Sequence, residues 1–241
     1  MKILSIGNSF STDAQRYLHR VAKSEGLNLK TANLFIGGCS LRTHYINVLE
    51  DNAHYIFGFN GEDTGLKVSV KQALISDEWD VVTIQQASHY SVDESTYFPY
   101  AEEVVNYVKK YCPNAKIYVH QTWAYENGSD RLLNVARCQT SEEMFKKLEC
   151  AYDKMAKAVN ADGIIPCGRV MLNASLKGVK VHRDTFHASF GFGRYMLALT
   201  WLKTLTGCDI LNNVFDEFDE PVSEQERAIA ISAVNDVLGV N

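Results

Sequence analysis

The 241-residue sequence lacks the features that mark several large classes of protein. It contains no apolar run long enough to span a bilayer, and it therefore predicts no transmembrane helix. It contains no block of lysine and arginine, and its formal net charge is −5, so it indicates no nucleic-acid or anionic-membrane surface. No linker rich in Pro, Gly and Ser divides it, and no internal repeat is visible. We therefore expect a single domain over residues 1–241.

Paired cysteine motifs are also absent. The six cysteines are scattered, with no CxxC pair and no histidine at zinc-finger spacing. This pattern predicts buried free thiols rather than a metal site, and we expect no cofactor. The oligomeric state is not indicated. The cysteines are Cys39, Cys112, Cys138, Cys150, Cys167 and Cys208.

No signal peptide is visible at the start of the chain. Met1 leads directly into an apolar strand, without a basic segment, an apolar stretch and a cleavage site. The sequence therefore predicts a cytoplasmic protein. If a signal peptide had been removed, the protein would instead be secreted or periplasmic.

Short apolar strands alternate with amphipathic helices along the chain. This alternation predicts a parallel sheet of about five strands with helices on both faces, a three-layer α/β/α arrangement. Ser11 or Thr12 can cap a first helix that runs to about Ser24. The strands are expected near 2–6, 29–36, 80–85, 116–120 and 163–166, with later helices near 97–111, 141–159, 189–206 and 223–238.

Residues 54–70 show a different pattern. Two apolar segments flank Asn60-Gly61, a dipeptide typical of tight hairpin turns. We interpret this segment as a hairpin excursion outside the central sheet.

Polar motifs follow the strands at one expected edge of the sheet. Ligands of open parallel sheets bind at the carboxyl ends of the strands. Ser9 follows the first strand, Gly38 the second, Gln85-Gln86 the third and His120-Gln121 the fourth. Their common position predicts a functional site at this edge.

Gly7-Asn8-Ser9 is the first candidate motif. The glycine permits a sharp bend, and the helix that starts behind it offers free backbone N–H groups beside Ser9. Asn8, Ser9 and Ser11 could instead only cap the helix.

Asp184-x-x-His187 is the second candidate motif. One loop can present both side chains, so that the carboxylate orients the imidazole and the imidazole activates Ser9. A capping aspartate with a surface histidine is the structural alternative. Together the two motifs contain the parts of a Ser-His-Asp triad.

These residues resemble the SGNH hydrolase superfamily, the GDSL-like esterases and lipases. Gly7-Asn8-Ser9-Phe10-Ser11 matches the block of the nucleophile, with Asn in place of Asp, and Gly38 matches the glycine that donates to the oxyanion. Asp184 and His187 match the last block. With the segments that end in Gln85-Gln86 and continue from His120 to Tyr125, the pattern resembles a subgroup of unknown function over residues 2–205. The resemblance implies the flavodoxin-like SGNH fold.

The third block departs from the superfamily pattern, because no Asn is present to complete the oxyanion hole. Some carbohydrate-esterase branches use Gln at this place, which implies Gln86 as the donor. Gln85 and His89 are the alternatives.

The resemblance implies that Ser9, His187 and Asp184 hydrolyse carboxylic esters through an acyl-enzyme. Backbone N–H groups of Ser9 and Gly38, with Gln86, would hold the oxyanion. We expect short acyl esters, such as acetyl groups on carbohydrates or small molecules. Trp123 and Gln121 follow the fourth strand and could contact a sugar ring, and Arg183 could bind a substrate carboxylate. Rim packing and pairing with an acid are the alternatives.

Two other functions compete with ester hydrolysis. A non-catalytic glycan-binding module on the same fold is the main alternative, although the three triad residues argue for catalysis. A doubly wound nucleotide-binding protein is disfavoured, because the first turn contains neither GxGxxG nor GxxxxGK[ST].

Overall fold

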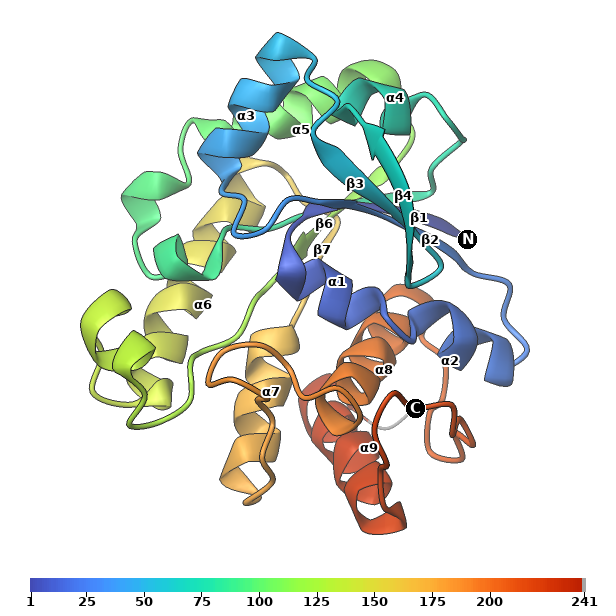
Figure 1. Ribbon diagram of the computed structural model, residues 1–241, viewed down its shortest axis with the longest axis vertical. Helices are drawn as coiled ribbons and strands as arrows, with labels where there is room; N and C mark the ends of the chain where they lie inside the picture. Colours follow the sequence, from blue (N-terminus) through green and yellow to red (C-terminus); the bar gives the residue numbers. More distant parts are fainter. Residues whose placement is uncertain (240–241) are drawn as a thin grey trace.

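The computed structural model describes residues 1–239, and a seven-stranded sheet forms its centre (Figure 1). The strand order is β4-β3-β2-β1-β5-β6-β7. The five strands β2, β1, β5, β6 and β7 are parallel to one another. This confirms the predicted flavodoxin-like α/β arrangement. The strands are β1 (Lys2–Gly7), β2 (Lys30–Phe35), β3 (Tyr55–Phe59), β4 (Glu62–Val68), β5 (Val81–Ile84), β6 (Lys116–His120) and β7 (Gly163–Ile165).

Helices cover both faces of the sheet and complete three layers (Figure 1). One face carries α3 (Leu41–Glu50), α4 (Val70–Leu74), α5 (Tyr100–Tyr111) and α6 (Ser141–Ala158). The other face carries α1 (Ser9–Gln15), α2 (Leu18–Ser24), α7 (Cys167–Leu176), α8 (Phe192–Thr206) and α9 (Glu224–Leu238). Short turns of helix lie in the connections, namely η1 (Ser88–Tyr90), η2 (Glu94–Thr96) and η3 (Arg131–Val135).

The central strands are largely apolar because both of their faces are buried, and the polar side chains of Ser5 and Thr83 hydrogen-bond each other. In β1, Ile3 packs into the core beneath α1, α2 and α8, whereas Leu4 and Ile6 pack into the core beneath α3 and α5. Covering both faces removes the alternation of polar and apolar residues that a half-exposed strand would show. The continuous apolar runs of the sequence follow from this arrangement.

The hairpin at residues 54–70 is part of the sheet, and its predicted place outside the sheet is wrong. β3 pairs antiparallel with β2, with Ala32 opposite Phe59, and β4 forms the exposed edge. The Asn60-Gly61 turn was predicted correctly. Tyr55 is fully buried at the start of β3, and burial of this ring anchors the hairpin to the domain.

Two predicted helix boundaries also differ from the structure. Asn8 caps α1 by accepting a hydrogen bond from Phe10 N, so the helix begins at Ser9 rather than after Ser11. The helix breaks before α2, where Tyr17 turns inward and its hydroxyl donates to Phe190 O at 2.6 Å. Helix α7 was missed, because it follows β7 directly after Pro166 and is short.

All six cysteines are free thiols, as predicted, but they are not all buried. Cys39, Cys112, Cys138 and Cys167 are buried, Cys150 is exposed and Cys208 is half-buried. Among residues 1–239, no helix combines the length and the apolar composition that crossing a membrane requires.

Candidate active site

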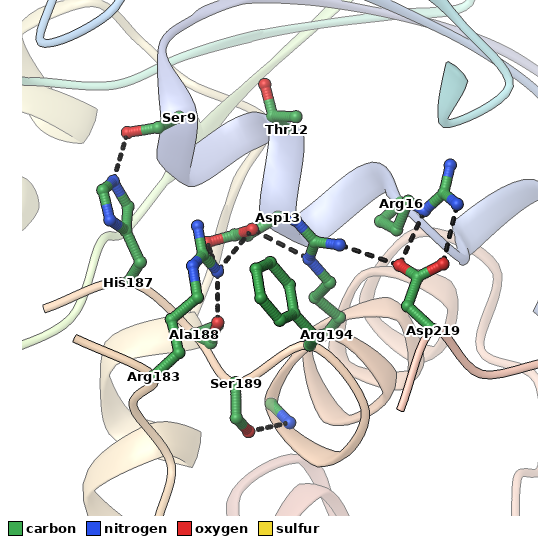
Figure 2. Close-up of polar contacts among 12 residues, drawn as sticks. Ser9, Thr12, Asp13, Arg16, Arg183, His187, Ala188, Ser189, Arg194 and Asp219 are labelled. Atoms are coloured by element: carbon green, nitrogen blue, oxygen red, sulfur yellow. Dashed lines mark hydrogen bonds and ion pairs between the residues drawn. The ribbon is translucent and has the colours of Figure 1, made fainter. Parts of the chain in front are cut away.

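The loop between α7 and α8 brings an imidazole to the serine that follows β1. His187 Nε2 lies 2.9 Å from Ser9 Oγ, and His187 Nδ1 lies 2.7 Å from Asp184 Oδ2. Figure 2 shows Ser9 at the first turn of α1 with His187 facing it from below. Residues far apart in the sequence thus form the hydrogen-bond chain of a nucleophile, a base and an orienting carboxylate.

Asp184 is ionised, and its side chain is exposed. Burial alone would raise the pKa of its carboxyl, but hydrogen bonds from the side chain and backbone of His187 outweigh burial and lower the pKa. Asp184 Oδ1 accepts from His187 N at 2.8 Å, while Oδ2 faces Nδ1. The carboxylate therefore fixes the ring so that Nε2 faces Ser9.

The backbone between these two residues is strained. Thr185 has φ +74°, a left-handed conformation that a β-branched residue rarely adopts. Such a conformation costs about 1–3 kcal/mol and persists only where surrounding contacts hold it. Here Glu126 N donates to Thr185 O at 2.8 Å, and the turn lets Asp184 fold back onto His187.

Arg183 pairs with an acid, which is the alternative to its predicted role in substrate binding. Its Nη1 donates to both carboxylate oxygens of Asp13, at 3.0 and 2.9 Å, and to Ala188 O (Figure 2). Asp13 lies on α1 and is 1% exposed, so the carboxylate requires a buried counter-charge. The pair ties the loop of His187 to the helix of Ser9.

Further arginines extend this cluster toward the surface. Arg194 of α8 donates to Asp13 at 2.9 Å and to Asp219 at 2.8 Å, and Arg16 forms a two-point contact with Asp219. The Cζ atoms of Arg183 and Arg194 each lie 4.5 Å from the ring centroid of Phe190. The cluster therefore joins α1, the loop of the histidine and α8.

Gly38 lies beside the turn of the serine, as expected. Asn8 Nδ2 donates to Cys39 O at 3.1 Å, which fastens the residue before Ser9 to the residue after Gly38. Gly38 has φ +62°, so a side chain here would strain the backbone. Within residues 1–239 the N–H groups of Ser9 and Gly38 have no hydrogen-bond acceptor. Both are therefore free to donate to a ligand.

The predicted oxyanion role of Gln86 does not fit the structure. Gln86 is fully buried, and its amide nitrogen donates to Thr96 O at 2.9 Å and Thr96 Oγ1 at 3.1 Å. Its carbonyl oxygen accepts from Leu41 N and Ala87 N. The amide thus links the loop before α3 to the turn near η2, and neither amide hydrogen remains for an oxyanion.

The alternative donors differ in their freedom. Gln85 is also buried, and its amide donates to Asn8 Oδ1 at 2.8 Å. His89 is half-buried, and a Cβ added to Gly38 would lie 3.9 Å from its Cε1. Burial, together with the charge of Arg131, lowers the pKa of His89. His89 is therefore the alternative that stays open beside Gly38.

A buried chain of hydrogen bonds joins His120 through Gln85 to Asn8, the residue before Ser9. His120 Nδ1 donates to Gln85 Oε1 at 2.7 Å, and Gln85 in turn donates to Asn8. Burial lowers the pKa of His120 to about 3, and its Nε2 has no partner within the described residues. A second proton on this ring would have no acceptor, so the chain requires a neutral imidazole.

We expect acid to destabilise the fold through this histidine. The unfolded chain takes up the proton below a pH of about 6.5, whereas the folded chain resists it until about pH 3. Stability is therefore lost as the pH falls through this window, by roughly 2 kcal/mol at pH 5 for one histidine. In His120→Gln, the difference in free energy of unfolding between pH 7 and pH 5 should shrink by about that amount, measured by urea titration. An unchanged difference would contradict the assignment.

Trp123 and Gln121 are structural, and their predicted contact with substrate is contradicted by their burial. Trp123 is fully buried and stacks on Phe10, with the two ring centroids 4.2 Å apart. Its indole N–H donates to Phe186 O at 2.7 Å. Gln121 is 3% exposed, and its carbonyl oxygen accepts from Arg169 N at the start of α7. Neither side chain is available to a sugar.

A cavity of about 440 Å³ adjoins Gly38. Hydroxyl groups, one arginine and His89 line it, and the lining contains no aliphatic side chain. A larger cavity of about 770 Å³ lies at the amino ends of the strands, beside Met1 and Lys116, and no triad residue lines it. Within residues 1–239, no group of three or more His, Cys, Asp or Glu side chains is arranged to hold a metal ion.

The fold is that of the SGNH hydrolases. A protein provisionally described as an SGNH hydrolase, from Slackia heliotrinireducens, aligns with a TM-score of 0.61 at 20% identity, over 85% of this chain and 98% of that chain. A variant of an acetyl xylan esterase from Geobacillus stearothermophilus aligns with a TM-score of 0.54 at 16% identity, over 85% and 94%. At these identities the likeness concerns the fold alone.

The chain belongs to the family described as "Domain of unknown function (DUF4886)", whose profile matches residues 2–237. The crystal structure of a DUF4886 family protein from Bacteroides uniformis ATCC 8492 aligns with a TM-score of 0.91 at 31% identity, over 98% of this chain and 94% of that chain. A comparison with curated proteins gave no match. The resemblance to a subgroup of unknown function within the SGNH fold is thereby confirmed.

Proposed function

We propose that this protein is a serine hydrolase of carboxylic esters. The observation that carries the proposal is the continuous chain from Ser9 Oγ through His187 to Asp184, with contacts of 2.9 and 2.7 Å. A serine hydroxyl alone is a weak nucleophile, and an oriented neutral imidazole is the group that activates it. The related fold of an acetyl xylan esterase supports the same chemistry.

The reaction follows from these positions. His187 Nε2 takes the proton of Ser9 as Oγ attacks the ester carbonyl, and the free N–H groups of Ser9 and Gly38 hold the resulting oxyanion, with His89 as the nearest further donor. His187 then gives the proton to the departing alcohol, which leaves an acyl group on Ser9. Water, activated by the same imidazole, releases the acid and restores Ser9.

The cavity beside Gly38 favours short acyl esters of polar alcohols. Ser40, Thr43, Ser95, Thr96 and Tyr100 contribute hydroxyl groups to it, which suits a carbohydrate or another polar compound. An extended acyl chain would need apolar lining, and this cavity has no aliphatic side chain. We therefore propose acetyl esters on carbohydrate or small polar substrates.

A series of p-nitrophenyl esters tests the acyl preference, with acetylated xylose and glucose as sugar substrates. We expect kcat/KM to fall by about tenfold or more from acetyl to octanoyl, because each poorly accommodated methylene loses transition-state binding. Higher kcat/KM on octanoyl would overturn the short-acyl proposal. Binding of the acetylated sugars without any hydrolysis would favour a glycan-binding module instead.

A further inference from the structure

Arg131 places a positive charge close to the candidate catalytic histidine. It is the first residue of η3 and is exposed. Its Cζ atom lies 3.8 Å from the ring centroid of Phe186, and that centroid lies 3.8 Å from the ring centroid of His187. A guanidinium group over an aromatic face is held there by cation–π attraction. The three side chains therefore form a stack that leads outward from the triad.

The charge of Arg131 is not neutralised, in contrast to the arginines of the neighbouring cluster. Arg16, Arg183 and Arg194 all pair with Asp13 or Asp219. No carboxylate within residues 1–239 forms an ion pair with Arg131. The adjacent acid, Asp130, instead accepts a hydrogen bond from the side chain of Asn134. Burial raises the pKa of Tyr125, and the charge of Arg131 together with a hydrogen bond from its side chain opposes that rise. A guanidinium carries five N–H donors, so others remain for an anionic ligand, for which their planar arrangement is suited.

The position of the stack indicates which part of an ester Arg131 would meet. His187 protonates the departing alcohol, so the alcohol oxygen of the ester lies beside the histidine. A group attached to this oxygen can extend past Phe186 as well as into the cavity beside Gly38. Phe186 and Arg131 continue from the ring of His187. The charge of Arg131 also reaches His89, whose pKa is lowered first by burial and then by this arginine. Arg131 therefore lies near both His187 and His89.

We propose that Arg131 selects esters whose alcohol portion carries a carboxylate, which its guanidinium binds. This proposal rests on the proposed ester hydrolysis and adds the substrate class. Ionic hydrogen bonds to a guanidinium distinguish a carboxylate from its neutral methyl ester, because only the charged form attracts the cation strongly.

Two acetyl esters of matched shape test the proposal, namely 4-acetoxybenzoate and methyl 4-acetoxybenzoate. The wild type should hydrolyse the carboxylate with the higher kcat/KM. In Arg131→Gln, the ratio of the two kcat/KM values should fall by about 10- to 100-fold, the loss expected for a charged hydrogen bond, mainly through a higher KM for the carboxylate. Arg131→Lys should recover part of the ratio, because it keeps the charge without the planar group.

Arg137→Gln is the matched control. Arg137 is exposed near the same turn and forms no ion pair within residues 1–239, so its loss removes one positive charge at the same end of the molecule. Its ratio should equal that of the wild type. An unaltered ratio in Arg131→Gln would overturn the role of Arg131 while ester hydrolysis stands. Failure of the wild type to hydrolyse either ester would overturn both proposals.

Discussion

Replacing Ser9 with alanine should lower kcat for p-nitrophenyl acetate by roughly 10⁴- to 10⁶-fold, with little change in the free energy of unfolding. The reason is that the hydroxyl 2.9 Å from His187 Nε2 is the atom that forms the acyl-enzyme. His187→Ala should lose activity to a similar extent, and Asp184→Asn somewhat less, because the ring can still act as a base in a less favourable orientation. Steady-state kinetics on purified variants measure these effects.

Ser175→Ala serves as the control for Ser9→Ala. Ser175 is exposed on α7, away from the carboxyl ends of the strands, and its hydroxyl takes no part in the proposed site. Its kcat should match that of the wild type. Equal activity in Ser9→Ala and Ser175→Ala would show that another residue is the nucleophile.

Replacing Trp123 with alanine should lower the free energy of unfolding by about 3–5 kcal/mol, the typical cost of emptying a buried tryptophan site. The side chain is fully buried, stacks on Phe10 and donates a hydrogen bond to Phe186 O. Because Phe10 follows Ser9 and Phe186 precedes His187, the cavity would also disturb the triad, and kcat should fall. Urea titration and steady-state kinetics measure the two effects together.

Trp123→Phe separates packing from hydrogen bonding. It keeps a ring against Phe10 but leaves Phe186 O without its donor, which should cost about 1–3 kcal/mol. A tryptophan that stacked on substrate would behave differently, because its removal would raise KM and leave stability intact. That second pattern would contradict the structural role given to Trp123.

The sequence predicted the parts of the site whose roles depend on local motifs. Gly7-Asn8-Ser9 and Asp184-x-x-His187 each show their chemistry within a few residues, and the carboxyl ends of parallel strands must share an edge. The structure places His187 within hydrogen-bond distance of both Ser9 and Asp184. Five of the seven strands were also predicted, because burial on both faces leaves continuous apolar runs.

The remaining roles depend on partners that no local pattern indicates. Gln86 has the chemistry of an oxyanion donor, but Thr96 occupies its amide hydrogens. Arg183 resembles a substrate ligand until Asp13, distant in sequence, is seen to pair with it. The pairing of β3 with β2 likewise depends on tertiary structure. An Asn-Gly turn predicts a hairpin but does not predict which strand the hairpin pairs with.

Arg131 and Phe186 were not recognised from the sequence at all. Their significance arises only from the stack with His187. This stack joins two segments that are separated in the sequence by α6, β7 and α7. The Asp-x-x-His spacing could have drawn attention to Phe186 as the intervening aromatic residue. Nothing in the sequence around Arg131 distinguishes it from an ordinary surface arginine.

Covalent labelling with a fluorophosphonate, followed by peptide mass spectrometry, tests the central claim most directly. The wild type should acquire one phosphonyl group, located on Ser9, because only an activated hydroxyl displaces fluoride rapidly. Labelling should be lost in Ser9→Ala and strongly slowed in His187→Ala. Modification of a different residue, or equally rapid labelling of Ser9 without His187, would contradict the proposed triad.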